Sequence, residues 1–312
     1  MSINSAKYTL KILILICFTC FITDKITYFI LDKISDKVYT GQTIGKVNHY
    51  LEIKENKRLL IFGSSRANHN IDPNILDTSS FNIGLDGRNI AYVTTLVKMI
   101  EKKTPQTILI QIDPEYIFDK NYKGEDIEPL EVKYHRNAVV KEEIDKLNIN
   151  NPFHYFFWSI LYNNKTISIV RSYLKPAYDY RTYNGYDPID IDENQKKIFR
   201  RILSQKKVVK CQDSLQINKL FYNYLVELKE FSKNKNKKLI FFTSPVYHDY
   251  CKEDNLELSK LAQHIKIDYS DFTDLFLKDN SESYWKDEIH LSRIGAEIFT
   301  KKFKEQLSTY TQ

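Results

Sequence analysis

The chain contains 312 residues, of which 42% are hydrophobic and 28% are charged, so it can bury a sizeable core and is not globally disordered. The length suits one α/β domain of about 200–250 residues with additional elements. The formal net charge is +6, but both signs are interspersed, and no basic block indicates a nucleic-acid partner. Only one segment is apolar enough to approach a membrane span, which excludes a polytopic membrane protein.

The segment near the N-terminus predicts a membrane anchor. Residues 8–31 are mostly apolar and carry only three charges, Lys11, Asp24 and Lys25. With the Asp24/Lys25 pair near the interface, the stretch reaches the length of about 20 residues that a spanning helix needs. No A-x-A-like cleavage site or lipobox follows, so we expect an uncleaved signal-anchor over residues 1–35 with its N-terminus inside. A cleaved signal and a buried helix of a soluble protein are the alternatives.

The four cysteines do not have the spacing of a metal site. Cys17 and Cys20 lie in the apolar segment, while Cys211 and Cys251 are forty residues apart. The latter two either form one bridge or remain two thiols. Because the sequence also lacks a phosphate-binding GxxxxGK[ST] motif and a cluster of metal ligands, we expect no cofactor and no metal.

Short, mainly apolar runs, most of them ended by Gly, Ser or Asp, predict the strands of a parallel sheet. The five runs are residues 59–62, 81–83, 107–112, 238–243 and 265–269. Helical periodicity separates them, over 89–103, from about 215 to 231, and from Ser292 onward. This alternation predicts a three-layer α/β/α fold with a five-stranded parallel sheet over residues 58–312, preceded by a juxtamembrane linker over 36–57.

The alternation fails between about residues 117 and 211, which indicates an insertion after the third strand. This stretch is rich in aromatic side chains, including Tyr155, Phe156, Phe157, Trp158, Tyr178, Tyr180, Tyr183 and Tyr186. They form either a small core of their own or a lid or sugar-stacking groove.

Three polar motifs follow strands of the predicted sheet. Gly63-Ser64-Ser65-Arg66 comes directly after the first strand and can present a serine hydroxyl above the sheet. Residues 82–87 contain two glycines that let backbone N–H groups approach a ligand. Asp287 precedes His290 by three residues just before the last helix, a spacing that lets a carboxylate bind the imidazole. Each motif alone has an ordinary structural explanation.

In this order and context the motifs resemble the SGNH (GDSL-like) hydrolase and acyltransferase superfamily, from about Arg58 to the C-terminus. The anchored form is similar to the accessory proteins of cell-envelope polymer acylation, such as teichoic-acid D-alanylation and exopolysaccharide acetylation. The resemblance implies Ser65 as nucleophile, His290 as its base and Asp287 as the residue that orients the imidazole. It also implies an oxyanion hole formed by the backbone N–H groups of Ser65 and Gly87.

One block of that superfamily is absent. Many members carry Gly-x-Asn-Asp after the third strand, whereas residues 111–116 here read Gln-Ile-Asp-Pro-Glu-Tyr. Loss of one oxyanion donor costs about 2.7–4 kcal/mol of transition-state stabilisation. We therefore expect a slow hydrolase, a different donor, or a transferase. The envelope branch also tends to lack this block.

These observations predict a serine-dependent O-acyltransferase acting on an envelope glycan or glycopolymer, with an extracytoplasmic catalytic domain on the inner or cytoplasmic membrane. The resemblance implies a membrane-bound O-acyltransferase as donor partner. A carbohydrate O-acetylesterase with the same triad, and a degenerate domain that binds glycan or scaffolds an export complex, are the alternatives. Arg66, Arg88 and His248 are candidates for substrate binding, and no role is assigned to Asn68 or His69.

Overall fold

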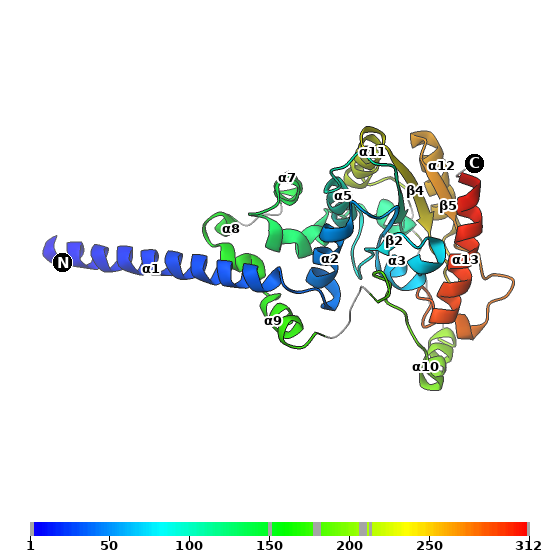
Figure 1. Ribbon diagram of the computed structural model, residues 1–312, viewed down its shortest axis with the longest axis horizontal. Coiled ribbons are helices and arrows are strands. Elements are labelled where there is room, and N and C mark those ends of the chain that lie inside the picture. Colours follow the sequence, from blue (N-terminus) through cyan, green and yellow to red (C-terminus); the bar gives the residue numbers. More distant parts are fainter. Residues whose placement is uncertain (1–2, 149–151, 177–181, 206–210, 212–213, 311–312) are drawn as a thin grey trace. The chain divides into compact units, whose positions relative to one another are not determined.

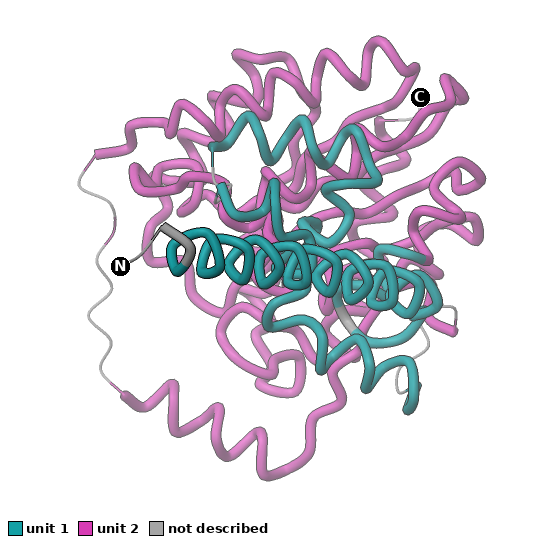
Figure 2. The backbone as a smooth tube through the Cα atoms, turned by 90° about the vertical axis from the view of Figure 1, so that its left-hand side faces the viewer, with its two compact units in different colours: residues 1–48, 129–178 teal, residues 49–128, 179–312 magenta. Residues whose placement is uncertain are grey.

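The structure, a computed structural model, describes residues 3–148, 152–176, 182–205, 211 and 214–310. The backbone divides into two compact units, each built from two stretches of the chain (Figure 2). Unit 1 comprises Met1–Asn48 and Pro129–Tyr178, and unit 2 comprises His49–Glu128 and Asp179–Gln312. The domain limits expected from the sequence, at residues 35 and 57, remain predictions. The division into compact units does not test which part of the chain folds independently.

Unit 1 begins with α1 (Ile3–Ser35), an apolar helix long enough to cross a membrane, as the sequence predicts (Figure 1). At about 1.5 Å per residue it extends about 50 Å, more than the roughly 30 Å of a hydrocarbon core. Its C-terminal part packs against η3 (Trp158–Tyr162) and α9 (Thr166–Leu174) and contributes Tyr28 to a buried cluster with Tyr162. The other helices of this unit are η1 (Gly41–Gly45), the first residues of α2 (Lys46–Ile53), α7 (Ala138–Leu147) and α8 (Phe153–Phe156).

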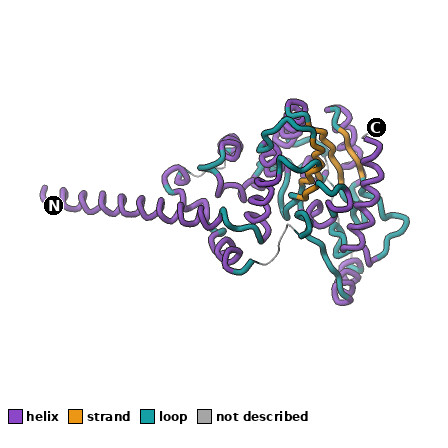
Figure 3. The backbone as a smooth tube through the Cα atoms, in the orientation of Figure 1, coloured by secondary structure: helices purple, strands orange, loops and turns teal. Residues whose placement is uncertain are grey.

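Unit 2 contains the sheet, whose strands lie side by side (Figure 3). All five strands run parallel, which confirms the predicted fold class. The strands are β1 (Leu59–Phe62), β2 (Ser80–Asn82), β3 (Gln106–Gln111), β4 (Lys237–Thr243) and β5 (Asp268–Asp271). Their order, β2-β1-β3-β4-β5, is one of the two common doubly wound orders. In such sheets a ligand binds beyond the carboxyl ends of the strands where the order reverses, here between β1 and β3.

Helices cover both faces of this sheet because alternate strand side chains point to opposite sides. On one face, Ile61, Leu109 and Phe242 join a buried cluster with Phe299 and Phe303 of α13 (Arg293–Tyr310). On the other face lie α5 (Ile90–Lys98) and α11 (Lys219–Asn234), which pack together. The remaining helices are α3 (Ser65–Asn70), α4 (Pro73–Leu76), α6 (Pro114–Ile117), α10 (Glu193–Leu203), α12 (Lys252–Ile265) and η4 (Glu282–Tyr284). η2 (Glu125–Lys133) begins in unit 2 and ends in unit 1.

Several element boundaries differ by a few residues from the sequence-based expectation, and two of the differences have a clear physical cause. The helix expected over 89–103 ends at Lys98, because the Glu55 carboxylate accepts hydrogen bonds from the backbone N–H groups of residues 101 and 102. The last strand, expected over 265–269, starts at Asp268, because Ile265 ends α12 and Lys266 adopts a left-handed conformation.

The aromatic side chains predicted in the insertion divide between several environments. Trp158 stacks on His135 and, together with Tyr28, packs in unit 1. Tyr186 is buried in the core of unit 2, whereas Tyr155 and Phe156 are exposed. Tyr178 and Tyr180 lie outside the described residues.

Candidate active site

The turn after β1 places two serines at the carboxyl end of the sheet. Gly63 has a φ of 147°, and a Cβ there would lie 2.7 Å from the Cβ of Gln111 on the neighbouring strand, so only glycine fits. Ser64 then caps α3, because its Oγ accepts a hydrogen bond from the N–H of Arg66 at 3.2 Å. Ser65 is the first residue of that helix, and its hydroxyl is not used by the cap.

Ser65, His290 and Asp287 meet although 225 residues separate the serine from the histidine. The Oγ of Ser65 lies 2.8 Å from Nε2 of His290. Nδ1 of His290 lies 3.0 and 2.9 Å from the two carboxylate oxygens of Asp287. This network fixes the imidazole with its proton on Nδ1, so that Nε2 faces the serine hydroxyl as an acceptor. It is the geometry of a serine activated by a base that a carboxylate orients.

The carboxylate of Asp287 is itself held in place. Its Oδ1 accepts the backbone N–H groups of Ile289 at 3.0 Å and His290 at 2.9 Å. Burial opposes ionisation, but the bonds from His290 and from the two backbone groups outweigh it and lower the pKa of Asp287. Its contribution to stability is therefore present above the unfolded pKa of about 3.9 and is lost as the pH falls through the lower folded value.

A residue that sequence reasoning missed joins the serine helix to the histidine loop. Asn70, at the end of α3, is fully buried. Its side chain accepts the N–H of Leu291 at 2.9 Å and donates to the carbonyl oxygen of Ile289 at 3.1 Å. These two bonds flank His290 in sequence, so Asn70 positions the imidazole relative to Ser65. An isolated asparagine inside a short helix carries no sequence signal of this role.

The backbone N–H groups of Ser65 and Gly87 are available for an oxyanion. Both residues line the same cavity, and neither amide donates a hydrogen bond to a residue that the structure describes. Gly87 has a φ of 68°, and no atom lies within 4 Å of the place that a Cβ would occupy. The turn is therefore open toward the cavity.

Gln111, the last residue of β3, and Asp113, which comes shortly after it, support the turn between β1 and α3. Oε1 of Gln111 accepts hydrogen bonds from the backbone N–H of Ser64 at 3.1 Å and from its hydroxyl at 2.7 Å. Asp113 forms an ion pair with Arg66, and both side chains are buried. Arg66 also donates to the carbonyl oxygens of Ser244 and Pro245. The guanidinium predicted to bind substrate is thus committed to contacts within the chain.

Asn68 and His69, to which the sequence assigns no role, hold the turn that carries Gly87. Asn68 donates to the carboxylate of Asp86 at 2.9 Å, and Nε2 of His69 lies 3.1 Å from the same carboxylate. Nδ1 of His69 lies 2.7 Å from the carbonyl oxygen of Asp187. Because both ring nitrogens face oxygen acceptors, only the protonated imidazole can donate a hydrogen bond to each of them. Burial opposes protonation, but the bond to Asp86 and its charge outweigh it and raise the pKa of His69.

Replacing His69 by glutamine is expected to destabilise the protein in a pH-dependent way. The stability that the raised pKa supplies is complete below the unfolded pKa of about 6.5 and is lost as the pH rises through the folded value. We expect His69→Gln to cost about 1.5–3 kcal/mol at about pH 6 and clearly less at about pH 9. Urea denaturation of both proteins at the two pH values measures this, and an equal loss at both would show that the ring is neutral when folded.

The cavity in front of Ser65 has a volume of about 830 Å³ and belongs to unit 2. Among the described residues it is lined by eight carboxylates but by only two arginines and one histidine. The carboxylates are Asp113, Glu115, Asp119, Glu125, Asp126, Asp249, Asp254 and Glu288; the others are Arg66, Arg88 and His248. Arg88 donates to the carbonyl oxygens of Asp86 and Asp126. The three predicted substrate-binding residues therefore line the cavity, but its acidic wall does not suit a polyanion.

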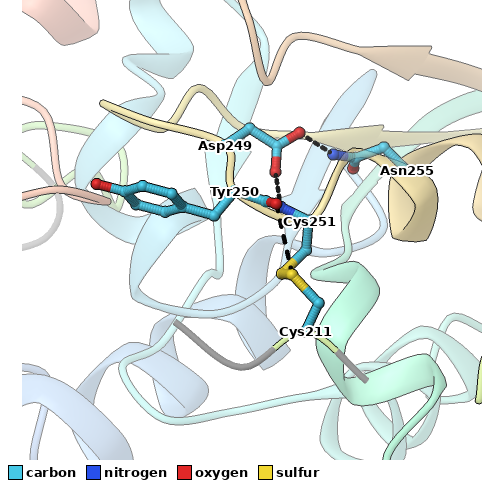
Figure 4. Close-up of a disulfide and its surroundings, with 5 residues drawn as sticks. All are labelled: Cys211, Asp249, Tyr250, Cys251 and Asn255. Carbon is cyan, nitrogen blue, oxygen red and sulfur yellow. Dashed lines mark hydrogen bonds between the residues drawn. A yellow bond between two sulfur atoms is a disulfide. The ribbon is translucent and has the colours of Figure 1, made fainter. Parts of the chain in front are cut away.

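Cys211 and Cys251 are bridged, which resolves the alternative that the sequence left open (Figure 4). Both cysteines line the cavity. Asp249 supports the bridge, because its carboxylate accepts the N–H of Cys251 at 3.0 Å and the amide of Asn255 at 2.9 Å. The disulfide ties residue 211 to the start of α12, beside the candidate site.

Replacing both cysteines of this bridge by serine is expected to destabilise unit 2. The two positions are forty residues apart, and a loop of that length corresponds to about 3–4 kcal/mol of lost chain entropy in the unfolded state. Thermal or urea denaturation of Cys211→Ser/Cys251→Ser against the unreduced parent measures the loss. A double variant as stable as the parent would mean that the bridge does not form in solution.

No family model and no curated protein matches the sequence. Among solved structures, the chain is similar to a Bacteroides fragilis protein provisionally described as an acylhydrolase. The two share 12% sequence identity and a TM-score of 0.41, over 83% of this chain and 90% of that chain. So distant a similarity carries nothing about the reaction, which is inferred below from the residues of the site.

Proposed function

We propose that the chain is a serine-dependent acyltransferase of the membrane-anchored, cell-envelope branch of the SGNH superfamily. The observation that carries this proposal is the continuous hydrogen-bonded series from Asp287 through His290 to the hydroxyl of Ser65. The hydroxyl of neighbouring Ser64 contacts Gln111, Asp113 and the helix backbone instead. That difference supports Ser65, and not Ser64, as the nucleophile.

The reaction proceeds in two steps. The Oγ of Ser65 attacks the carbonyl carbon of an ester or thioester while Nε2 of His290 takes its proton. The tetrahedral oxyanion accepts hydrogen bonds from the N–H groups of Ser65 and Gly87. It collapses to an acyl-serine as His290 returns the proton to the leaving alcohol or thiol. An acceptor hydroxyl, whose proton His290 takes, then attacks the acyl-serine. The second tetrahedral intermediate collapses, His290 returns the proton to the Oγ of Ser65, and the acylated acceptor leaves.

The acceptor that suits the site is a glycan hydroxyl without nearby negative charge. Carboxylates dominate the cavity wall, so an anionic polymer would be repelled close to Ser65, whereas a neutral or cationic sugar would not.

The Cys211–Cys251 bridge is typical of an oxidising, extracytoplasmic compartment. With α1 as anchor, the catalytic unit would act at the outer face of the inner or cytoplasmic membrane, with a membrane-bound O-acyltransferase as donor partner.

The direct test is the fate of an acyl group supplied to the full-length protein in detergent. We expect p-nitrophenyl acetate to be consumed, and neutral oligosaccharides to gain acetyl groups detectable by mass spectrometry, at a rate lost in Ser65→Ala. Consumption without acetylation of any sugar would favour the esterase alternative. No consumption by a folded protein would favour the degenerate, glycan-binding alternative.

A further inference from the structure

Unit 1 exposes apolar side chains in the helices that follow residue 152. These side chains, here called the apolar patch, are Phe153, Tyr155, Phe156, Ile160, Ile167, Tyr173 and Leu174. Ile167 is 85% exposed and Leu174 is 69% exposed, although both lie on a helix whose other face reaches the buried cluster around Tyr28. Both η3 and α9 pack against α1, so these exposed side chains flank that helix, and a large exposed apolar surface marks an interaction site.

The apolar patch continues onto the exposed surface of α1. Lys25 of α1 donates a hydrogen bond to the carbonyl oxygen of Phe156 at 2.5 Å. Ile160 and Phe157 line a groove of about 400 Å³ together with α1 residues between Thr19 and Thr27. On α1 itself, Phe21, Ile22, Ile26, Phe29 and Ile30 are exposed. The medium that surrounds α1 between Thr19 and Ile30 therefore also contacts the apolar patch.

The charges on α1 at the level of the patch are satisfied within unit 1. The carboxylate of Asp24 accepts the backbone N–H groups of Trp158 and Ser159, both at 2.9 Å, and the hydroxyl of Ser159. The ammonium of Lys25 lies 4.2 Å from the centre of the Trp158 ring. Pairing of this kind reduces the cost of placing both charges beside a bilayer.

The net charge of the chain also resides in unit 1. Residues 1–48 and 129–178 contain 13 lysines and arginines and 7 aspartates and glutamates, an excess of six that equals the excess of the whole chain. Unit 2 is therefore formally neutral. A unit with this excess of basic residues, which also exposes Tyr155 and Tyr173, fits the headgroup region of an anionic bilayer.

We propose that the apolar patch lies in the boundary between headgroups and acyl chains of an anionic membrane, so that unit 1 surrounds α1 as an interfacial collar. The inference rests on α1 as a membrane anchor, which is part of the proposed function. It adds that the outer end of α1 does not leave the membrane as an isolated helix followed by a free linker. The patch fixes unit 1 against the lipid surface by its own contacts.

The test places one fluorescent label at a time on the full-length protein in vesicles of phosphatidylglycerol and phosphatidylcholine. In a Cys17→Ser/Cys20→Ser background, Ile167→Cys reports on the patch. Ile198→Cys, which is 59% exposed on α10 of unit 2, is the matched control. Native Cys17, retained alone in a Cys20→Ser protein, reports on insertion of α1. Quenching is then measured with lipids that carry a nitroxide near the headgroup for positions 167 and 198, and with lipids that carry it on the acyl chain for position 17.

We expect quenching at position 167 to exceed that at 198 by about threefold or more, and to fall in vesicles of phosphatidylcholine alone. Quenching at 17 with none at 167 above the control would overturn the collar while leaving the anchor intact. Protection of position 167 that depends on protein concentration would assign the patch to a second copy and also overturn it. Absence of quenching at 17 as well would show that the anchor, and the collar with it, is wrong.

Discussion

Ser65→Ala is expected to lower kcat for ester substrates by about 10³-fold or more, because the alanine removes the nucleophile that His290 activates. What remains would be the contribution of the oxyanion donors and of substrate binding. The measurement is the hydrolysis of p-nitrophenyl acetate by parent and variant, with circular dichroism to show that both are folded. Little effect on stability is expected, since the Ser65 hydroxyl does not cap α3.

Ser64→Ala is the matched control, because it removes the neighbouring hydroxyl. That hydroxyl caps α3 and contacts Gln111, so its loss should cost about 1 kcal/mol of stability while kcat stays within about tenfold of the parent. The opposite pattern, with an inactive Ser64→Ala and an active Ser65→Ala, would reverse the assignment of the two serines.

Asp113→Ala is expected to cost about 3–5 kcal/mol of stability, because it leaves the buried guanidinium of Arg66 without its counter-ion. The side chains of the pair are only 8% and 7% exposed. Arg66 also joins α3 to the carbonyl groups that follow β4, so the loss should be seen as an earlier urea transition and a lower yield of folded protein. Urea denaturation followed by circular dichroism gives the free energy of unfolding.

Two further variants test the cause of that loss. Asp190→Ala breaks a bidentate but largely exposed pair with Arg293, and should cost no more than about 1 kcal/mol. Arg66→Met/Asp113→Leu removes both buried charges and should be less destabilised than Asp113→Ala. If the double variant is as unstable as Asp113→Ala, the loss does not come from leaving one buried charge unpaired. The Arg66–Asp113 pair would then stabilise the fold through its own contacts.

The strands and the site motifs could be predicted from the sequence because both depend on local patterns. The run at residues 59–62 is apolar throughout, as buried parallel strands are, and Gly63 ends it. The carboxyl ends of parallel strands meet at one edge of the sheet. A serine after β1 and a histidine just before the last helix therefore meet at that edge once the strand order is known.

The supporting contacts could not be predicted, because each joins residues that no local pattern relates. Asn70 contacts residues 289 and 291, and Arg66 contacts Asp113 and residues 244 and 245. The sequence predicts Arg66 as a substrate-binding residue because it follows Ser65, but the sequence does not show that Asp113 is its buried partner. The pairing of Cys211 with Cys251 likewise follows from the position of α12 and not from cysteine spacing.

The most direct test of the proposed activity is covalent trapping of the nucleophile. The full-length protein in detergent would be treated with a fluorophosphonate and examined by intact mass and peptide mapping, beside Ser64→Ala, Ser65→Ala and His290→Ala. The predicted result is one adduct on Ser65, retained in Ser64→Ala, absent from Ser65→Ala and strongly slowed in His290→Ala. A folded parent protein that acquires no adduct, or acquires it elsewhere, would contradict the assignment of Ser65 as an activated nucleophile.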